Sequence, residues 1–157
     1  MTSRRVALLL SVLLALGLAA CGSGSSASTG PSNAPAGGPL TVKDAWVRAA
    51  PSGADTAAYF TIVNGKVDAD TLVGVSASVG KSAGLHRTST DPSGMTGMQM
   101  TDSVKIPGGG SIQFAPGGYH VMIVGLAAEL KAGDQVVLQL SFENAGVVKV
   151  TAEVRTS

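Results

Sequence analysis

Residues 135–155 read QVVLQLSFENAGVVKVTAEVR, and this stretch decides the fold class. Apolar and polar side chains alternate on both sides of a short break at residues 144–146, which read Asn-Ala-Gly. Alternation with a period of two is typical of a β-strand that buries one face, and a short break containing Asn and Gly is typical of a hairpin turn. One face of the predicted hairpin carries the apolar side chains Val136, Leu138, Leu140, Phe142, Val148, Val150, Ala152 and Val154.

The same alternation occurs in two earlier segments. In residues 56–64 one face carries Ala58, Phe60 and Ile62, and the other carries Tyr59, Thr61 and Val63. In residues 73–79 one face carries Val73, Val75, Ala77 and Val79. Both segments are therefore predicted to be strands with a core-facing side.

Glycine- and proline-rich segments separate further short strands. Residues 107–110 read PGGG and residues 115–118 read APGG, and the second of these leads into a predicted strand over residues 119–126. Within residues 40–157 no window keeps a helical period. We therefore expect residues 40–157 to form one all-β domain, an antiparallel Greek-key β-sandwich or barrel.

The N-terminal residues predict export and lipid anchoring. Arg4 and Arg5 precede an apolar run over residues 6–20, which is too short for a confident transmembrane helix and is typical of a signal peptide over residues 1–20. The run ends in Leu-Ala-Ala-Cys21, which is similar to the bacterial lipobox, and Cys21 is the only cysteine in the sequence. We expect an exported protein, lipid-anchored through Cys21 to the cell membrane and facing the periplasm or the extracellular side. A simple signal peptide with a coincidental cysteine is the alternative.

Composition excludes several classes of function. Residues 21–39 contain no charged side chain and no large apolar one, so they predict a flexible linker behind the lipidated cysteine. The sequence has 11 Lys and Arg against 10 Asp and Glu, so no basic field could hold a nucleic acid. A single cysteine excludes an intramolecular disulfide and a cysteine-based zinc or iron–sulfur site.

The two histidines and several methionines are the candidate metal ligands. His120 and Met122 are two residues apart in the strand predicted over residues 119–126, so they project from one face, about 6.5–7 Å apart. His86 and Met98 lie on an earlier stretch, which could bring two imidazoles and two thioethers together if it packs beside that strand. Imidazole and thioether without thiolate favour Cu(I) over zinc. The alternative is that the methionines fill the core and each histidine is an ordinary strand residue.

The spacing of these residues resembles that of a known family. His86, Met98, His120 and Met122 are arranged like the H(M)-x10-M-x21-H-x-M signature of the periplasmic copper chaperone A family, also called PCu(A)C-like proteins. The segments DAWVR (44–48), AAYF (57–60), IPGG (106–109) and PGGYHVM (116–122) follow in the order of that family.

This resemblance implies a cupredoxin-like β-sandwich and a specific function. The four signature residues would bind one Cu(I), which the protein would deliver to the binuclear copper site of cytochrome c oxidase, alongside a Sco-type protein. One position departs from the pattern, because Arg87 follows the first histidine where the family often has methionine. Met95 or Met100 could substitute for that missing ligand, and we expect Arg87 to point to solvent.

The leading hypothesis is a membrane-tethered Cu(I) chaperone that acts as a monomer. A copper-buffering or storage lipoprotein would use the same site, and a β-sandwich interaction module without metal is a further alternative. An electron-transfer cupredoxin would need a cysteine thiolate beside its histidines, which this domain lacks. We do not expect an enzyme, because no serine elbow or paired carboxylates accompany the histidines.

Overall fold

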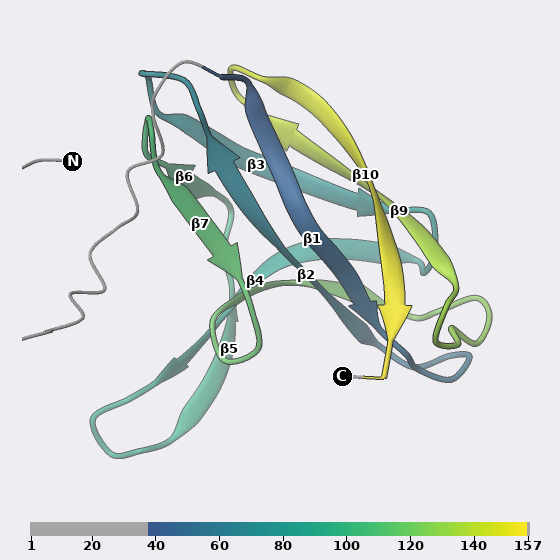
Figure 1. Ribbon diagram of the computed structural model, residues 1–157. Helices are drawn as coiled ribbons and strands as arrows, with labels where there is room; N and C mark the ends of the chain where they lie inside the picture. The colour runs from purple at the N-terminus through teal and green to yellow at the C-terminus, as the bar shows by residue number, and fades with distance from the viewer. Residues whose placement is uncertain (1–37, 157) are drawn as a thin grey trace, which may run out of the picture.

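The computed structural model describes residues 38–156, all of whose regular structure is β (Figure 1). The predicted signal peptide, Cys21 and most of the predicted linker lie outside the described residues. None of the described residues belongs to a helix long and apolar enough to cross a membrane. The strands are β1 (Leu40–Arg48), β2 (Thr56–Asn64), β3 (Asp70–Ala77), β4 (Ser82–Thr90), β5 (Thr96–Met100), β6 (Val104–Ile106), β7 (Ser111–Phe114), β8 (Tyr119–Val124), β9 (Gln135–Phe142) and β10 (Gly146–Arg155).

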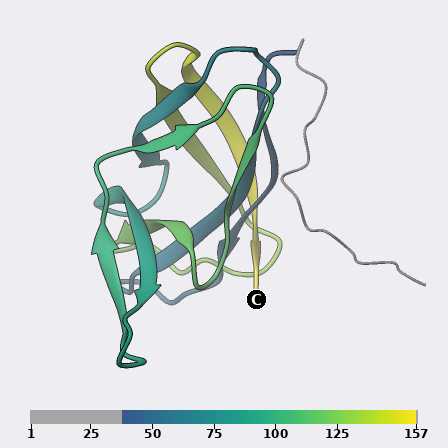
Figure 2. The same ribbon diagram turned by 90° about the vertical axis from the view of Figure 1, so that its left-hand side faces the viewer.

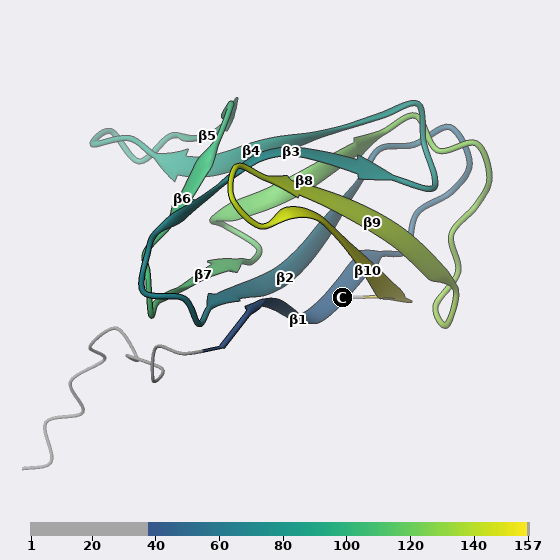
Figure 3. The same cartoon turned by 90° about the horizontal axis from the view of Figure 1, so that it is seen from above.

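The strands are hydrogen-bonded in the order β5-β4-β8-β7-β2-β1-β10-β9-β3-β6, and β8 also pairs with β2. This sheet curls around the core, so that β1 and β2 lie on one side and β3 and β4 on the other (Figure 3). Most neighbours are antiparallel, which confirms the predicted all-β architecture. The exceptions within the described residues are β1 with β10 and a short contact of β7 with β8, both parallel.

The C-terminal hairpin forms as predicted. β9 and β10 pair from Gly146 opposite Phe142 to Glu153 opposite Gln135. The β9 side chains that were expected on the inner face are buried, as are Ala152 and Val154 of β10. Burying apolar surface contributes about 25 cal/mol per Å², so the buried side chains of this hairpin contribute to the driving force for folding. Fully buried side chains of the wider core include Val47, Phe60, Ile62, Leu72, Ile106, Phe114, Val121 and Ile123.

The prediction for residues 73–79 was wrong at Val73. The strand begins earlier, at Asp70, and the register with β9 shifts between Leu72 and Gly74, which leaves Val73 as an extra residue in a β-bulge. As a result Leu72 takes the core position and Val73 is 44% exposed. Val75 packs against the core as predicted, together with Ala77 and Val79.

Two turns set the limits of the strands near the candidate site. β8 ends at Val124 and not at Leu126, because Gly125 has a φ of 64° and donates its N–H to the Asp55 carboxylate at 2.8 Å. The turn between β4 and β5 is held by Asp91, which accepts hydrogen bonds from Ser93 and from the Met95 N–H at 2.9 Å. This hairpin projects from the rest of the domain (Figure 2), and β5 is exposed along its whole length.

Candidate metal centre

Strands β4 and β8 bring the two histidines together. The strands are antiparallel, and His86 is the direct cross-strand partner of His120. Their ring centroids are 5.8 Å apart, with 34° between the ring planes. Direct partners in an antiparallel pair project from the same face of the sheet, so the two imidazoles share one surface.

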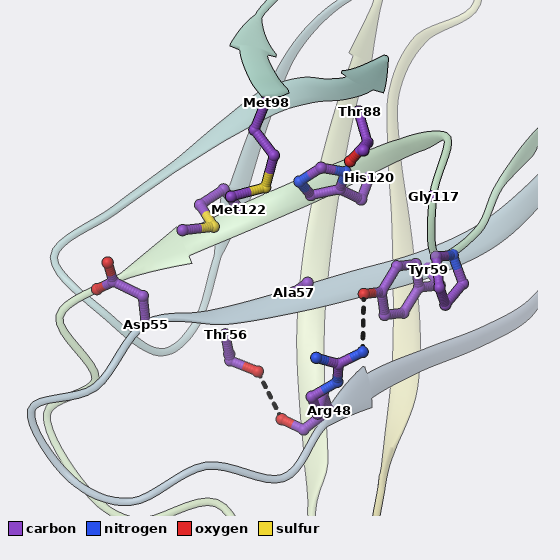
Figure 4. Close-up of a pocket in the computed structure, with 11 residues that line it drawn as sticks. Arg48, Asp55, Thr56, Ala57, Tyr59, Thr88, Met98, Gly117, His120 and Met122 are labelled. Carbon is purple, nitrogen blue, oxygen red and sulfur yellow. Dashed lines mark hydrogen bonds between the residues drawn. The ribbon is translucent and has the colours of Figure 1, made fainter. Parts of the chain in front are cut away.

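The two signature methionines join this surface from either side. Met122 lies opposite Gly84 and Met98 lies opposite Thr88, and both positions have the same face as His86. Met98 is on β5, two strands away from β8, and its long side chain extends across β4. Figure 4 shows the side chains of Met98, His120 and Met122 pointing toward one another across a pocket of about 280 Å³.

The ring of His120 is held in one orientation. It is 5% exposed, and its Nδ1 lies 3.1 Å from the carbonyl oxygen of Gly118. Because a carbonyl oxygen can only accept, Nδ1 must carry the proton and donate it. In the neutral ring the lone pair is then on Nε2, which is the arrangement seen when a second hydrogen bond prepares a histidine to bind a metal. Tyr59 supports the ring, with centroids 6.5 Å apart, and Trp46 stacks on Tyr59 at 4.5 Å.

His86 is half-buried and leans over a glycine. A Cβ placed on Gly84 would lie 3.7 Å from His86 Nε2, which is ordinary van der Waals contact, so the ring lies directly beside this position. Burial lowers the pKa of His86, and the neighbouring His120 lowers it further. A lower pKa keeps the ring neutral at lower pH, and the neutral ring is the form that can donate a lone pair to a metal.

The opposite wall of the pocket is polar, and the sequence did not predict that its residues lie beside the candidate ligands. Arg48 donates from Nη2 to the Tyr59 hydroxyl at 3.5 Å, and Thr56 donates from Oγ1 to the Arg48 carbonyl at 2.6 Å. Asp55 also lines the pocket. These residues flank the β1–β2 connection, and only the pairing of β2 with β8 places them beside His120. Their one signal in the sequence is that Arg48 ends the DAWVR segment.

The remaining residues of interest lie at different places on the β4–β5 hairpin. Arg87 is exposed, faces away from the histidine surface, and places its guanidinium 5.3 Å from the centre of the Tyr119 ring. Met100 is the direct cross-strand partner of His86. Met95 lies outside this row and lines a separate hollow with Ser89 and Gln99.

The kinds of donor atom on this surface favour one class of metal ion over others. In the part of the chain that the structure describes, no group of three or more His, Cys, Asp or Glu side chains could hold a metal ion. The cluster combines two imidazoles with soft, uncharged thioethers. Such a set suits Cu(I) better than Ca²⁺, Mg²⁺ or Zn²⁺, which prefer oxygen, or nitrogen and thiolate.

Comparison with known proteins finds a matching family and a related sequence. Residues 40–154 match the model of a family described as "Putative lipoprotein LpqE-like". A relative from Leifsonia xyli subsp. xyli, "Putative lipoprotein Lxx21020", is 34% identical over 116 residues, which cover 74% of this chain and 69% of the relative.

Two solved structures, both of copper-bound forms, are also similar to this chain. The copper-bound PCuAC domain from PmoF2 is 26% identical with a TM-score of 0.63, over 76% of this chain and 95% of that domain. The Cu(I) form of DR1885 from Deinococcus radiodurans is 32% identical with a TM-score of 0.58, over 76% of this chain and 81% of that protein. These likenesses confirm the cupredoxin-like β-sandwich that the sequence resemblance implied.

Proposed function

Because this chain belongs to the LpqE-like lipoprotein family, we propose that it is a membrane-tethered chaperone for Cu(I). The observation that carries the proposal is the convergence of two imidazoles and two thioethers on one face of β4, β5 and β8, in a domain similar to copper-bound PCuAC domains. The proposed ligands are His86, Met98, His120 and Met122.

The chemistry of the site fits a monovalent copper ion. Thioether sulfur is a soft, neutral donor that prefers Cu(I) to harder divalent ions. The neutral imidazole of His120 already has its lone pair on Nε2, because Gly118 fixes the tautomer. Thioethers cannot form disulfides, so the set stays competent in an oxidising compartment outside the cytosol.

The position of the site supports transfer of copper to another protein. Met98 is 60% exposed, and the pocket opens on the outer face of the sheet instead of into the core. A partner's donors can therefore reach the ion while this chain still holds it. We propose the binuclear copper site of cytochrome c oxidase as the acceptor, alongside a Sco-type protein, with Cys21 as the lipid anchor.

The ligand set is tested by Cu(I) titration combined with X-ray absorption. We expect one Cu(I) per chain, with two nitrogen and two sulfur ligands. His120→Ala should lower the Cu(I) affinity by about 100-fold, since it removes a whole ligand, and loss of a group that only hydrogen-bonds to a ligand already costs about 10–100-fold. Ser82→Ala, on β4 but exposed and outside the pocket, is the control.

Two results would contradict this proposal. One is a His120→Ala protein that binds Cu(I) as tightly as the wild type in competition with a calibrated chelator. The other is an absorption spectrum without sulfur ligands, which would remove both methionines from the site. Binding without transfer to any acceptor would instead indicate copper storage.

A further inference from the structure

Strand β5 carries a second thioether on the histidine surface. The register places Met98 opposite Thr88 and Met100 opposite His86, and side chains two residues apart on a strand share a face. His86 therefore has His120 as its neighbour on one side and Met100 on the other. Direct cross-strand neighbours have Cβ atoms about 4.5–5.5 Å apart, which is within reach of a flexible methionine.

The methionine on β8 is less exposed than the two methionines on β5. Met122 is half-buried, Met98 is 60% exposed and Met100 is 75% exposed. β5 is the edge strand of the sheet, so no further strand covers Met100. The surface that holds the proposed copper ligands is thus open to a partner at Met100.

Met100 also lines a groove. This groove has a volume of about 210 Å³ and lies between β3 and β4, with Val73, Val75 and Leu85 among its lining residues. Val73 is exposed here because the β-bulge turns it out of the core. Met100 lines this groove and none of the four proposed ligands does, so a partner seated in the groove would contact Met100.

We propose that Met100 is an exchange ligand, through which copper leaves the site toward an acceptor that binds with thiolate sulfur. This inference rests on the proposed function. Met100 Sδ forms a bond to copper as the bond from Met98 Sδ breaks. An acceptor thiolate then forms its own bond to copper as the bond from Met100 breaks, and the bonds from His86, His120 and Met122 break as the acceptor's second thiolate binds. Copper remains Cu(I), both thioethers remain neutral, and neither a proton nor an electron leaves this chain.

The physical advantage is that a replacement sulfur of this chain is available when the bond from Met98 breaks. Met100 is two residues from Met98 on the same strand and directly opposite His86, so this exchange does not wait for a donor to diffuse in. Because Met100 is not required for the resting site, its loss should affect the transfer rate more than the affinity.

Met95 provides a matched control. It is on the same hairpin and is 71% exposed, nearly as much as Met100. It lines a hollow with Ser89, Gly97 and Gln99, whose positions alternate with those of Met98 and Met100. Met95→Leu therefore removes an exposed thioether without touching the histidine surface.

The experiment measures affinity and transfer separately. The full chain, purified in detergent and loaded with one Cu(I) without oxygen, is mixed with a synthetic peptide containing a Cys-x-x-Cys pair, and transfer is followed by stopped flow. Affinity is measured by competition with bicinchoninate. We expect Met100→Leu to slow transfer by about tenfold and to change the affinity by less than about threefold. Met95→Leu should change neither.

Three other outcomes would contradict the inference, and one of them would also contradict the proposed function. If Met100→Leu transfers copper as fast as Met95→Leu, Met100 is not an exchange ligand. If Met100→Leu loses affinity as fully as Met98→Leu, Met100 is an ordinary ligand of the resting site, and the inference is also wrong. If the wild type binds no Cu(I), the proposed function fails at the affinity step, before transfer is measured, and the inference fails with it.

Discussion

His86 and His120 reach the same surface under different constraints. The Gly118 carbonyl holds Nδ1 of His120 by a hydrogen bond and the Tyr59 ring lies beside the imidazole, so the ring is oriented before the proposed binding of copper. His86 is half-buried with its ring over Gly84, and burial and its histidine neighbour lower its pKa. A hydrogen bond orients one proposed ligand, His120. Burial and the neighbouring imidazole make protonation of the other proposed ligand, His86, less favourable.

Acid should therefore release copper. Protons compete with Cu(I) for each imidazole, and the lowered pKa of His86 means that this ring is protonated only below the ordinary histidine value of about 6.5. We expect the affinity to be constant above neutral pH and to fall in acid as His86 is protonated, by up to about tenfold per pH unit. Chelator competition from pH 8 to pH 5 measures this. His86→Ala should make the fall less steep, and an affinity that does not change over this range would contradict the prediction.

At the scale of elements, Asp70 connects the start of β3 to the turn between β9 and β10. It is 2% exposed, and its carboxylate accepts backbone N–H groups of Thr71 at 2.8 Å, Asn144 at 3.0 Å and Ala145 at 2.8 Å. Burial alone would raise the pKa of Asp70, but these hydrogen bonds, with the charge of Lys66, outweigh burial and lower it. The ionised carboxylate therefore stabilises the folded state.

Asp70→Asn should lower the free energy of unfolding by about 1–3 kcal/mol at pH 7, because the amide replaces one accepting oxygen with a donor. A lowered pKa means that the stabilisation is present above the ordinary aspartate value of about 3.9 and is lost as pH falls through the folded pKa. Urea unfolding at pH 7 and at pH 3 tests this. The two proteins should differ less at pH 3, and an equal difference at both values would contradict the role of the charge.

The local sequence pattern was sufficient to predict the strands whose side chains alternate between an inner and an outer face. β2 and β9 have the predicted bounds, and the C-terminal hairpin has the predicted turn. The bulge at Val73 was not predicted, because it depends on how β3 pairs with β9 and not on the residues of β3 alone. The parallel pairing of β1 with β10 joins the two ends of the domain, and no local pattern reports such a contact.

The candidate site shows the same limit. The two histidines and Met122 could be placed on one surface from the spacing within one strand and a family signature. Arg48 and Asp55 could not, because they reach the pocket through a pairing between β2 and β8, more than 60 residues apart. Likewise, the sequence alone did not show that Met100 shares the histidine surface and Met95 does not, because this depends on the register of β4 with β5.

At the scale of the whole molecule, the core and the candidate site are separate. The core lies inside the curled sheet and is built from apolar side chains, whereas the proposed ligands lie on the outer face of β4, β5 and β8. We therefore expect the domain to fold without metal. The apo protein should give a β-type far-ultraviolet circular dichroism spectrum and a cooperative thermal transition, and Cu(I) should only raise the melting temperature. A random-coil spectrum that becomes ordered only on adding copper would contradict this.

The direction of β1 has a consequence for how an anchored molecule presents its cargo. The chain enters the domain at Leu40, and Arg48, at the other end of the same strand, lines the pocket. Eight residue steps along a strand span roughly 26 Å. The chain segment that leads to the proposed anchor and the proposed copper site therefore lie at opposite ends of β1. We therefore expect a receiving protein to approach the end of the domain that lies away from the proposed attachment point, within the reach that the predicted linker allows.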